Sequence, residues 1–123
     1  MSTATVDIEQ DDGRIARYRR HAGGGYVSVD AEAHETATIS RGSYVDEGAR
    51  VGQGARVWED AWVEQDAVIG PLATIGSRAR IGRGARIGAQ AVVGSGAFVP
   101  AGAVVPALGR VPADTRYGVR RAA

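Results

Sequence analysis

The sequence predicts an all-β, single-domain fold, a parallel β-helix of about five triangular coils, and three observations predict it. β-Branched residues recur at every sixth position, small residues recur two positions before them, and glycine is abundant, with 18 among 123 residues. One Phe and one Met are too few for an ordinary globular core. The interior must therefore be built from Val, Ile and Ala.

The apolar repeat runs unbroken from residue 27 to residue 111. A spacing of six fits no α-helix, whose apolar residues recur at three and four, and no single strand, whose apolar residues alternate. It fits a solenoid in which each flat side is one hexapeptide and three sides make a coil. At about 4.8 Å per coil, five coils form a prism roughly 24 Å tall. The fifteen members are Val27, Ala33, Ile39, Val45, Val51, Val57, Val63, Ile69, Ile75, Ile81, Ile87, Val93, Val99, Val105 and Val111.

A small residue lies two positions before each inward aliphatic residue, as Ala79 lies before Ile81. The triangular interior is narrow near each bend, so it has room for Ala or Ser but not for Leu. Two further sets of glycines are predicted to serve bends with unusual backbone dihedral angles. One set directly follows the aliphatic residue (Gly52, Gly70, Gly76, Gly82, Gly88, Gly94), and the other lies three positions before the next one (Gly42, Gly48, Gly54, Gly84, Gly96, Gly102).

The repeat resembles that of the hexapeptide-repeat family of left-handed parallel β-helices, over about residues 25–111. The resemblance is carried by stretches such as Ile81-Gly82-Arg83-Gly84-Ala85-Arg86-Ile87-Gly88. It implies a left-handed coil and, as in most members of the family, a homotrimer. It leaves the function open, because the family includes acyltransferases that use acyl-CoA donors, γ-class carbonic anhydrases and purely structural members.

The repeat divides the chain into three parts: an N-terminal hairpin or arm that acts as a cap (1–24), the β-helix (25–112) and a C-terminal tail (113–123). Pro100, Pro106 and Pro112 take the same position on three successive sides of the last coil. Proline lacks the N–H group that a further coil would use. These prolines are therefore predicted to cap the C-terminal end.

The first residues predict a short hairpin. Val6 and Ile8 precede the turn sequence Asp11-Asp12-Gly13, and Ile15 and Tyr18 follow it. Two roles are open for this segment. It can cover the exposed edge of the first coil, or it can reach a neighbouring subunit or partner.

Sorting the outward residues by side places most aromatic residues of the repeat in one column. This aromatic column consists of Tyr26, Tyr44, Trp62, Arg80 and Phe98, which are eighteen residues apart. Aromatic residues stack well along strands, which explains part of the pattern. An exposed apolar stripe is uncommon on soluble monomers, so the column is also predicted to be the oligomer or partner interface. Arg80 is placed for cation–π contact with Trp62 and Phe98.

The net charge of +1 hides an asymmetry between the two halves of the chain. Residues 30–66 hold nine acidic and three basic residues, whereas residues 67–123 hold eight Arg and one acidic residue, Asp114. Because sequence order is axial order in a solenoid, this pattern gives the prism a polarity that favours docking between oppositely charged surfaces. A solvated surface explains it equally well. Binding of nucleic acid is unlikely given the acidic residues.

Two histidines, His21 and His34, are the available general bases. Acyltransferases of the family use a His toward the hydroxyl or amine of the acceptor. His34 has acidic neighbours in sequence and is the one defensible candidate if the chain is an enzyme. No insertion interrupts the repeat to form an acceptor pocket. A γ-class carbonic anhydrase needs three His around one metal ion, so neither a metal site nor a cofactor is predicted.

The absence of Cys and of an apolar run of about 20 residues predicts a cytoplasmic protein without a membrane segment. These observations together favour a non-catalytic structural or interaction module, a trimer bound to a protein partner in a larger assembly such as a shell, a filament or a virion surface. The alternative is an acyltransferase-like enzyme that uses an acyl-CoA donor at the clefts between subunits, with His34 as its base.

Overall fold

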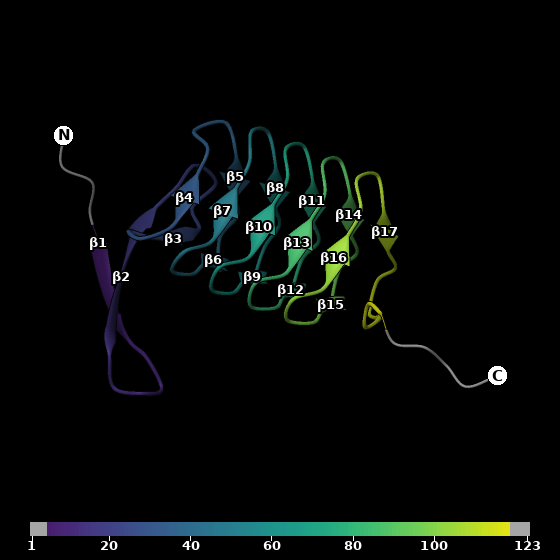
Figure 1. Cartoon of the computed structure of the whole chain (residues 1–123). Coiled ribbons are helices and arrows are strands. Elements are labelled where there is room, and N and C mark those ends of the chain that lie inside the picture. Colours follow the sequence, from purple (N-terminus) through teal and green to yellow (C-terminus); the bar gives the residue numbers. More distant parts are fainter. Residues whose placement is uncertain (1–4, 119–123) are drawn as a thin grey trace.

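The computed structural model describes residues 5–118, which form strands and turns and no helix (Figure 1). None of the described segments is therefore a helix that could cross a membrane. The strands are β1 (Thr5–Glu9), β2 (Ile15–Arg20), β3 (Tyr26–Ser28), β4 (Glu32–Ala33), β5 (Thr38–Ile39), β6 (Tyr44–Val45), β7 (Arg50–Val51), β8 (Arg56–Val57), β9 (Trp62–Val63), β10 (Val68–Ile69), β11 (Thr74–Ile75), β12 (Arg80–Ile81), β13 (Arg86–Ile87), β14 (Val92–Val93), β15 (Phe98–Val99), β16 (Val104–Val105) and β17 (Arg110–Val111).

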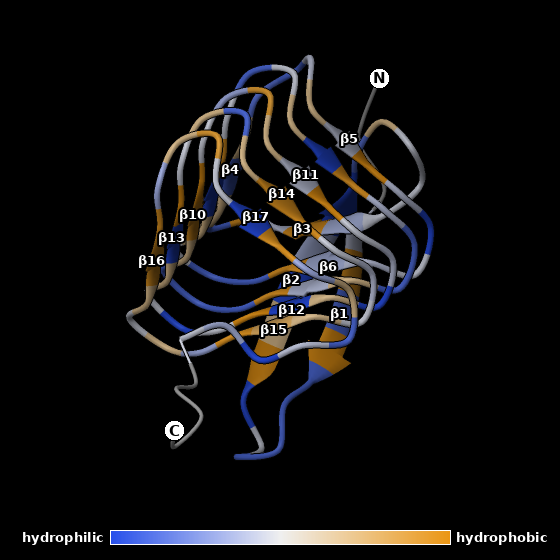
Figure 2. Ribbon diagram, turned by 90° about the vertical axis from the view of Figure 1, so that its right-hand side faces the viewer, coloured by the Kyte–Doolittle hydropathy of each residue, from blue (hydrophilic) through white to orange (hydrophobic). Residues whose placement is uncertain are grey.

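Three sheets form the sides of the prism, and Figure 2 shows them around the axis of the coil. Their strands are parallel except for β1 and β2, which pair antiparallel in the first sheet. The first sheet has the order β1-β2-β3-β6-β9-β12-β15, the second β16-β13-β10-β7-β4 and the third β17-β14-β11-β8-β5. In the coils, each strand residue pairs with the residue eighteen positions further along the chain, as Val27 does with Val45. The predicted left-handed β-helix of about five coils is confirmed.

The core consists of the inward residues that the period predicts. Ile39, Ile75 and Ile81 are completely buried, and so are the small residues Ala55 and Ala73. Each aliphatic side chain packs on its counterparts in the neighbouring coils, so the core is one continuous cluster. Ala33, the one member that is not β-branched, is only half-buried.

The bends use glycine for two different reasons. Residues three before the next aliphatic residue have positive φ, as predicted, and Gly84 has a φ of 68°. The glycines directly after the aliphatic residue do not, so that part of the prediction was wrong. They are needed for space instead, because a Cβ atom on Gly82 would lie 2.5 Å from the backbone nitrogen of Ala101 in the next coil.

The two ends of the solenoid are closed differently. At the N-terminal end, strands β1 and β2 form the predicted hairpin, and β2 pairs antiparallel with β3 (Figure 1). In the earlier coils, the residue directly after the inward aliphatic residue donates its N–H group to the next coil, as Gly88 does to Val105 O. At the C-terminal end, prolines take this position and have no N–H group to donate. Part of the predicted tail continues the coil, since Tyr117 N donates to Phe98 O. Residues 119–123 of that tail lie outside the described residues.

Candidate functional site

The two histidines lie close together at the bend between the second and third sheets. His21 follows β2, and His34 follows β4. Nε2 of His21 lies 3.1 Å from His34 O and 3.0 Å from Ala37 O. The fold therefore brings to one bend two residues that are thirteen positions apart in the sequence.

The bonds of His21 determine which of its ring nitrogens carries the proton. Two carbonyl oxygens can only accept, so Nε2 must be the N–H donor of the neutral ring. Nδ1 then carries the lone pair and is the basic atom. The same bonds have a structural effect, because Ala37 O belongs to the first coil, where no preceding coil supplies an N–H group. His21 thus caps the coil and holds its own ring in a fixed orientation.

His34 has its lone pair on the same ring atom, Nδ1, but there the lone pair is engaged. Its Nδ1 lies 2.7 Å from Thr36 Oγ1 and accepts a hydrogen bond of 3.1 Å from the Thr36 backbone N–H group. Because Nδ1 is an acceptor, the Thr36 hydroxyl group is the donor in their contact, while its oxygen accepts a bond from Gly54 N. The lone pair of the neutral ring is therefore engaged. His34, the base predicted from the sequence, is less suited to take a proton than His21.

The aromatic column has the predicted geometry. The rings of Tyr26 and Tyr44 stack with centroids 5.5 Å apart. The Arg80 guanidinium group lies 4.5 Å from the Trp62 ring centroid and 5.6 Å from that of Phe98. Arg116 continues the column beyond its predicted end, 5.3 Å from the Phe98 centroid. That this face is an interface between subunits stays a prediction.

The hairpin covers the first part of this column. The ring of Tyr18 meets that of Tyr44 edge-on, with centroids 5.5 Å apart, and Tyr18 is only 4% exposed. Its hydroxyl donates to Asp46 Oδ1 at 2.7 Å, and Trp62 Nε1 donates to Asp46 Oδ2 at 2.6 Å. Burial, followed by the hydrogen bond to Asp46, raises the pKa of the Tyr18 hydroxyl far above its usual range. A buried carboxylate thus joins the hairpin to the coils.

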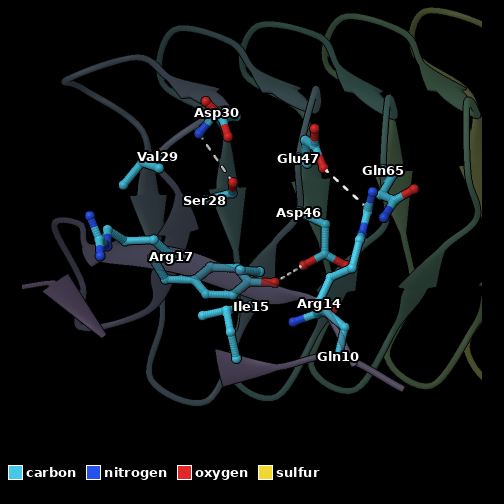
Figure 3. Close-up of a pocket in the computed structure, with 12 residues that line it drawn as sticks. Gln10, Arg14, Ile15, Arg17, Ser28, Val29, Asp30, Asp46, Glu47 and Gln65 are labelled. Carbon is cyan, nitrogen blue, oxygen red and sulfur yellow. Dashed lines mark hydrogen bonds and ion pairs between the residues drawn. The ribbon is translucent and has the colours of Figure 1, made fainter. Parts of the chain in front are cut away.

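Two hollows flank this contact. The hairpin cleft, of about 320 Å³, lies between Gln10 and Arg14 on the hairpin and Asp46, Glu47 and Gln65 on the coils (Figure 3). The aromatic hollow, of about 300 Å³, is lined by Tyr18, Tyr44 and Trp62 together with Ile8, Glu9, Gln10, Asp11 and Asp46. No insertion interrupts the repeat, as the sequence predicts, and residues of the hairpin line both hollows.

The sequence analysis missed the Tyr18–Asp46–Trp62 contact, for which one signal was present. Asp46 directly follows an inward aliphatic residue, a position that many coils fill with glycine. Within residues 5–118, no group of three His, Cys, Asp or Glu side chains is placed to hold a metal ion.

Comparison with known proteins gives a family and a set of solved structures. The family model described as bacterial transferase hexapeptide (six repeats) matches residues 60–95. No curated protein sequence matches the chain. The acetyltransferase PerB from Caulobacter crescentus, solved with CoA and GDP-perosamine, is 20% identical with a TM-score of 0.53, and the match covers 76% of this chain and 52% of PerB. This likeness shows the fold.

Two further solved structures match at lower TM-scores. The acetyltransferase domain of PglB from Neisseria gonorrhoeae, in complex with acetyl coenzyme A, is 29% identical with a TM-score of 0.49, covering 75% of this chain and 53% of that one. Serine acetyltransferase isoform 3 from Entamoeba histolytica is 19% identical with a TM-score of 0.39, covering 79% and 35%. The chain thus spans about half the length of PglB and PerB.

These findings correct the functional prediction. The family model that matches residues 60–95 is one of transferases, so the prediction of a non-catalytic module in a shell, filament or virion surface was wrong. The uninterrupted repeat had counted against catalysis. The six-residue period, however, reflects only how the coils pack. A segment outside the repeat can form the walls of an active site, so an uninterrupted repeat does not exclude catalysis.

Proposed function

We propose that this chain, which is built from the hexapeptide repeats of that transferase family, transfers an acyl group from an acyl-CoA donor to a hydroxyl or amine group of an acceptor. The observation that carries the proposal is the geometry of His21. Its ring is fixed by two carbonyl oxygens, so that Nδ1 is the basic atom. A general base near neutral pH is what such a transfer requires.

In the proposed reaction, Nδ1 of His21 takes the proton of the acceptor group as its oxygen or nitrogen attacks the thioester carbonyl carbon. The new C–O or C–N bond forms, the C–S bond breaks, and the thiolate leaves. The imidazolium ring of His21 then returns the proton to the sulfur. The hydrogen bonds from Nε2 to the carbonyl oxygens of His34 and Ala37 strengthen when the ring is charged, which stabilises the intermediate.

The charge asymmetry along the axis of the prism supports one orientation of the bound acyl-CoA donor. The phosphate groups of CoA are anionic, and the later coils hold more exposed arginines than the early coils, Arg86 on β13 and Arg110 on β17 among them. His21 lies at the other end, in the first coil. We therefore orient the nucleotide toward the later coils and the thioester toward His21, so that the donor follows the axis of the prism.

His21 is half-buried and lies at an outer bend of the coil, and we place the acceptor pocket in the cleft that a second subunit would form beside it. A homotrimer, the common state in the family, supplies such a cleft. The acceptor site then belongs to the assembly rather than to one protomer. Accordingly, activity should depend on the oligomer as well as on His21.

The test compares two matched variants, His21→Gln and His34→Gln, in an assay of thiol release from acetyl-CoA with a panel of amines and alcohols. Gln keeps an N–H donor near the place of Nε2 but has no basic nitrogen. His21→Gln should lower turnover by roughly 10²–10⁴-fold at unchanged CoA affinity by calorimetry, and His34→Gln should stay within a few fold of the wild type. Loss of turnover only in His34→Gln would refute the role of His21. Absence of CoA binding to the wild-type trimer would refute acyl transfer itself.

A further inference from the structure

The aromatic column places a guanidinium group over almost every ring. Arg20 lies 5.5 Å from the ring centroid of Tyr26, Arg80 lies over Trp62 and Phe98, and Arg116 lies over Phe98. Within the described residues, Tyr44 is the one ring of the column without such a cation. A cation in contact with Tyr44 must therefore come from outside residues 5–118.

The aromatic hollow opens at this position. Tyr44 uses one face for Tyr26 and meets the edge of Tyr18, and Trp62 is 42% exposed. Asp46 fixes the indole ring through Nε1, so the surface that Trp62 offers to the hollow is its π system rather than its N–H group. Aromatic faces attract cations through their quadrupole, and most strongly at Trp.

The charges around the hollow also favour a cation. Glu9 and Asp11 line it from the hairpin, and no basic residue lines it. Neither carboxylate forms one of the ion pairs found among residues 5–118. The hollow, of about 300 Å³, is at the lower end of the range for ligand pockets, which fits a small ligand.

We propose that the aromatic hollow binds a small organic cation, an alkylammonium or guanidinium group, between Tyr44 and Trp62. Trp62 already has the Arg80 guanidinium group over its ring from the next coil, and Glu9 and Asp11 balance the charge of the bound cation. The ligand is either a free amine or the arginine side chain of a partner, and both share this chemistry. The proposal does not rest on acyl transfer, since the hollow lies on the first sheet and the histidines lie at another bend.

The test uses the intact chain with Trp58→Phe, which leaves Trp62 as the reporter of tryptophan fluorescence. Choline chloride is titrated against NaCl at equal ionic strength and against the neutral isostere of choline, in which a tert-butyl group replaces the trimethylammonium group. Choline should change the emission of Trp62 in a saturable manner, and the other two should not. Calorimetry with choline on the wild-type chain provides the second readout.

Charge variants decide whether the hollow is the site. Glu9→Gln with Asp11→Asn should weaken the binding about fivefold, as expected for two exposed charges. The matched control, Glu35→Gln with Glu59→Gln, should leave it unchanged. Propylguanidinium binding more tightly than choline would identify an arginine side chain as the ligand, and the reverse would identify a free amine. Equal responses to choline and NaCl, or equal weakening by the two double variants, would overturn the proposal.

Discussion

The hydroxyl group of Tyr18 donates a hydrogen bond of 2.7 Å to Oδ1 of Asp46, and this bond joins β2 of the hairpin to the bend after β6. The other oxygen of the carboxylate accepts from Trp62 Nε1. Asp46 is 9% exposed, so the carboxylate has little water to replace a lost partner. Three residues far apart in the sequence therefore hold the N-terminal hairpin in place.

Breaking this contact should loosen the hairpin before the coils. Tyr18→Phe leaves one oxygen of a buried carboxylate without its donor, which costs about 1–3 kcal/mol. Asp46→Ala also removes the bond to Trp62 and should cost more. Hydrogen exchange of the amides of β1 and β2 measures the effect, with the amides of β11 as the internal control. Equal protection of the hairpin in Tyr18→Phe and the wild type would contradict this account.

Alkaline pH should release the hairpin through the same contact. The pKa of the Tyr18 hydroxyl is raised in the folded protein by burial and by Asp46, whereas the unfolded chain has an ordinary tyrosine with a pKa of about 10. A raised folded pKa gives stability that is complete below the unfolded pKa and is lost as the pH rises above it. Stability should therefore fall above about pH 10.

Tyr18→Phe should remove that part of the alkaline loss of stability. The difference in phenolate absorbance between wild type and variant isolates the titration of Tyr18 itself. It should appear at higher pH than the titration of free tyrosine. A difference curve centred on the usual tyrosine range would show that the buried contact with Asp46 is absent in solution.

The fold could be predicted in detail because its signal is local and repeated. Every coil places an aliphatic residue such as Ile81 and a small residue such as Ala79 in the same two registers, so each repeat supports the same prediction. The glycines showed the limit of this reasoning. Gly84 is needed for its positive φ and Gly82 for close backbone contact, yet both requirements select glycine, so the sequence does not distinguish them.

The candidate site was harder to predict because it is not periodic. The sequence identified both histidines, yet it could not show that Thr36 engages His34 Nδ1 or that two carbonyl oxygens set the tautomer of His21. The placement of β2 beside β3 brings Tyr18 onto the aromatic column. Such contacts depend on the path of the hairpin, on which the repeat carries no information.

The two glycine roles predict different responses to alanine. Gly82→Ala places a Cβ atom against the backbone of the next coil, which should cost about 1–3 kcal/mol by forcing the coils apart. Gly84→Ala meets no atom within 4 Å but forces a side chain into positive φ, at a cost of about 1–2 kcal/mol. Gly84→Asn should recover much of that cost, since Asn tolerates this region. Thermal unfolding compares these three variants with a fourth, Gly82→Asn. A recovery of stability in Gly82→Asn relative to Gly82→Ala would refute the distinction.

Leu108 should be replaceable with a gain in stability. It is 69% exposed and has a φ of 63°, a combination in which leucine is strained and buries little. Leu108→Asn should stabilise the chain by about 0.5–1 kcal/mol in thermal unfolding, because Asn adopts left-handed backbone dihedral angles with less strain than Leu. Leu108→Ala keeps the strain and serves as the control. A loss of stability together with a smaller oligomer would show instead that a second subunit covers Leu108.

The predicted interface can be tested at Phe98, which lies on the aromatic column far from the hairpin. If this face packs against another subunit, Phe98→Ser should weaken association by about tenfold or more, because buried aromatic residues dominate interfaces. Val92→Ser is the matched control, since Val92 is a half-buried outward residue of β14 on a different sheet. Sedimentation over a range of protein concentrations measures both variants. Wild-type association in Phe98→Ser would exclude this face as the interface and leave the column as an intramolecular stack, stabilised by Arg80 and Arg116.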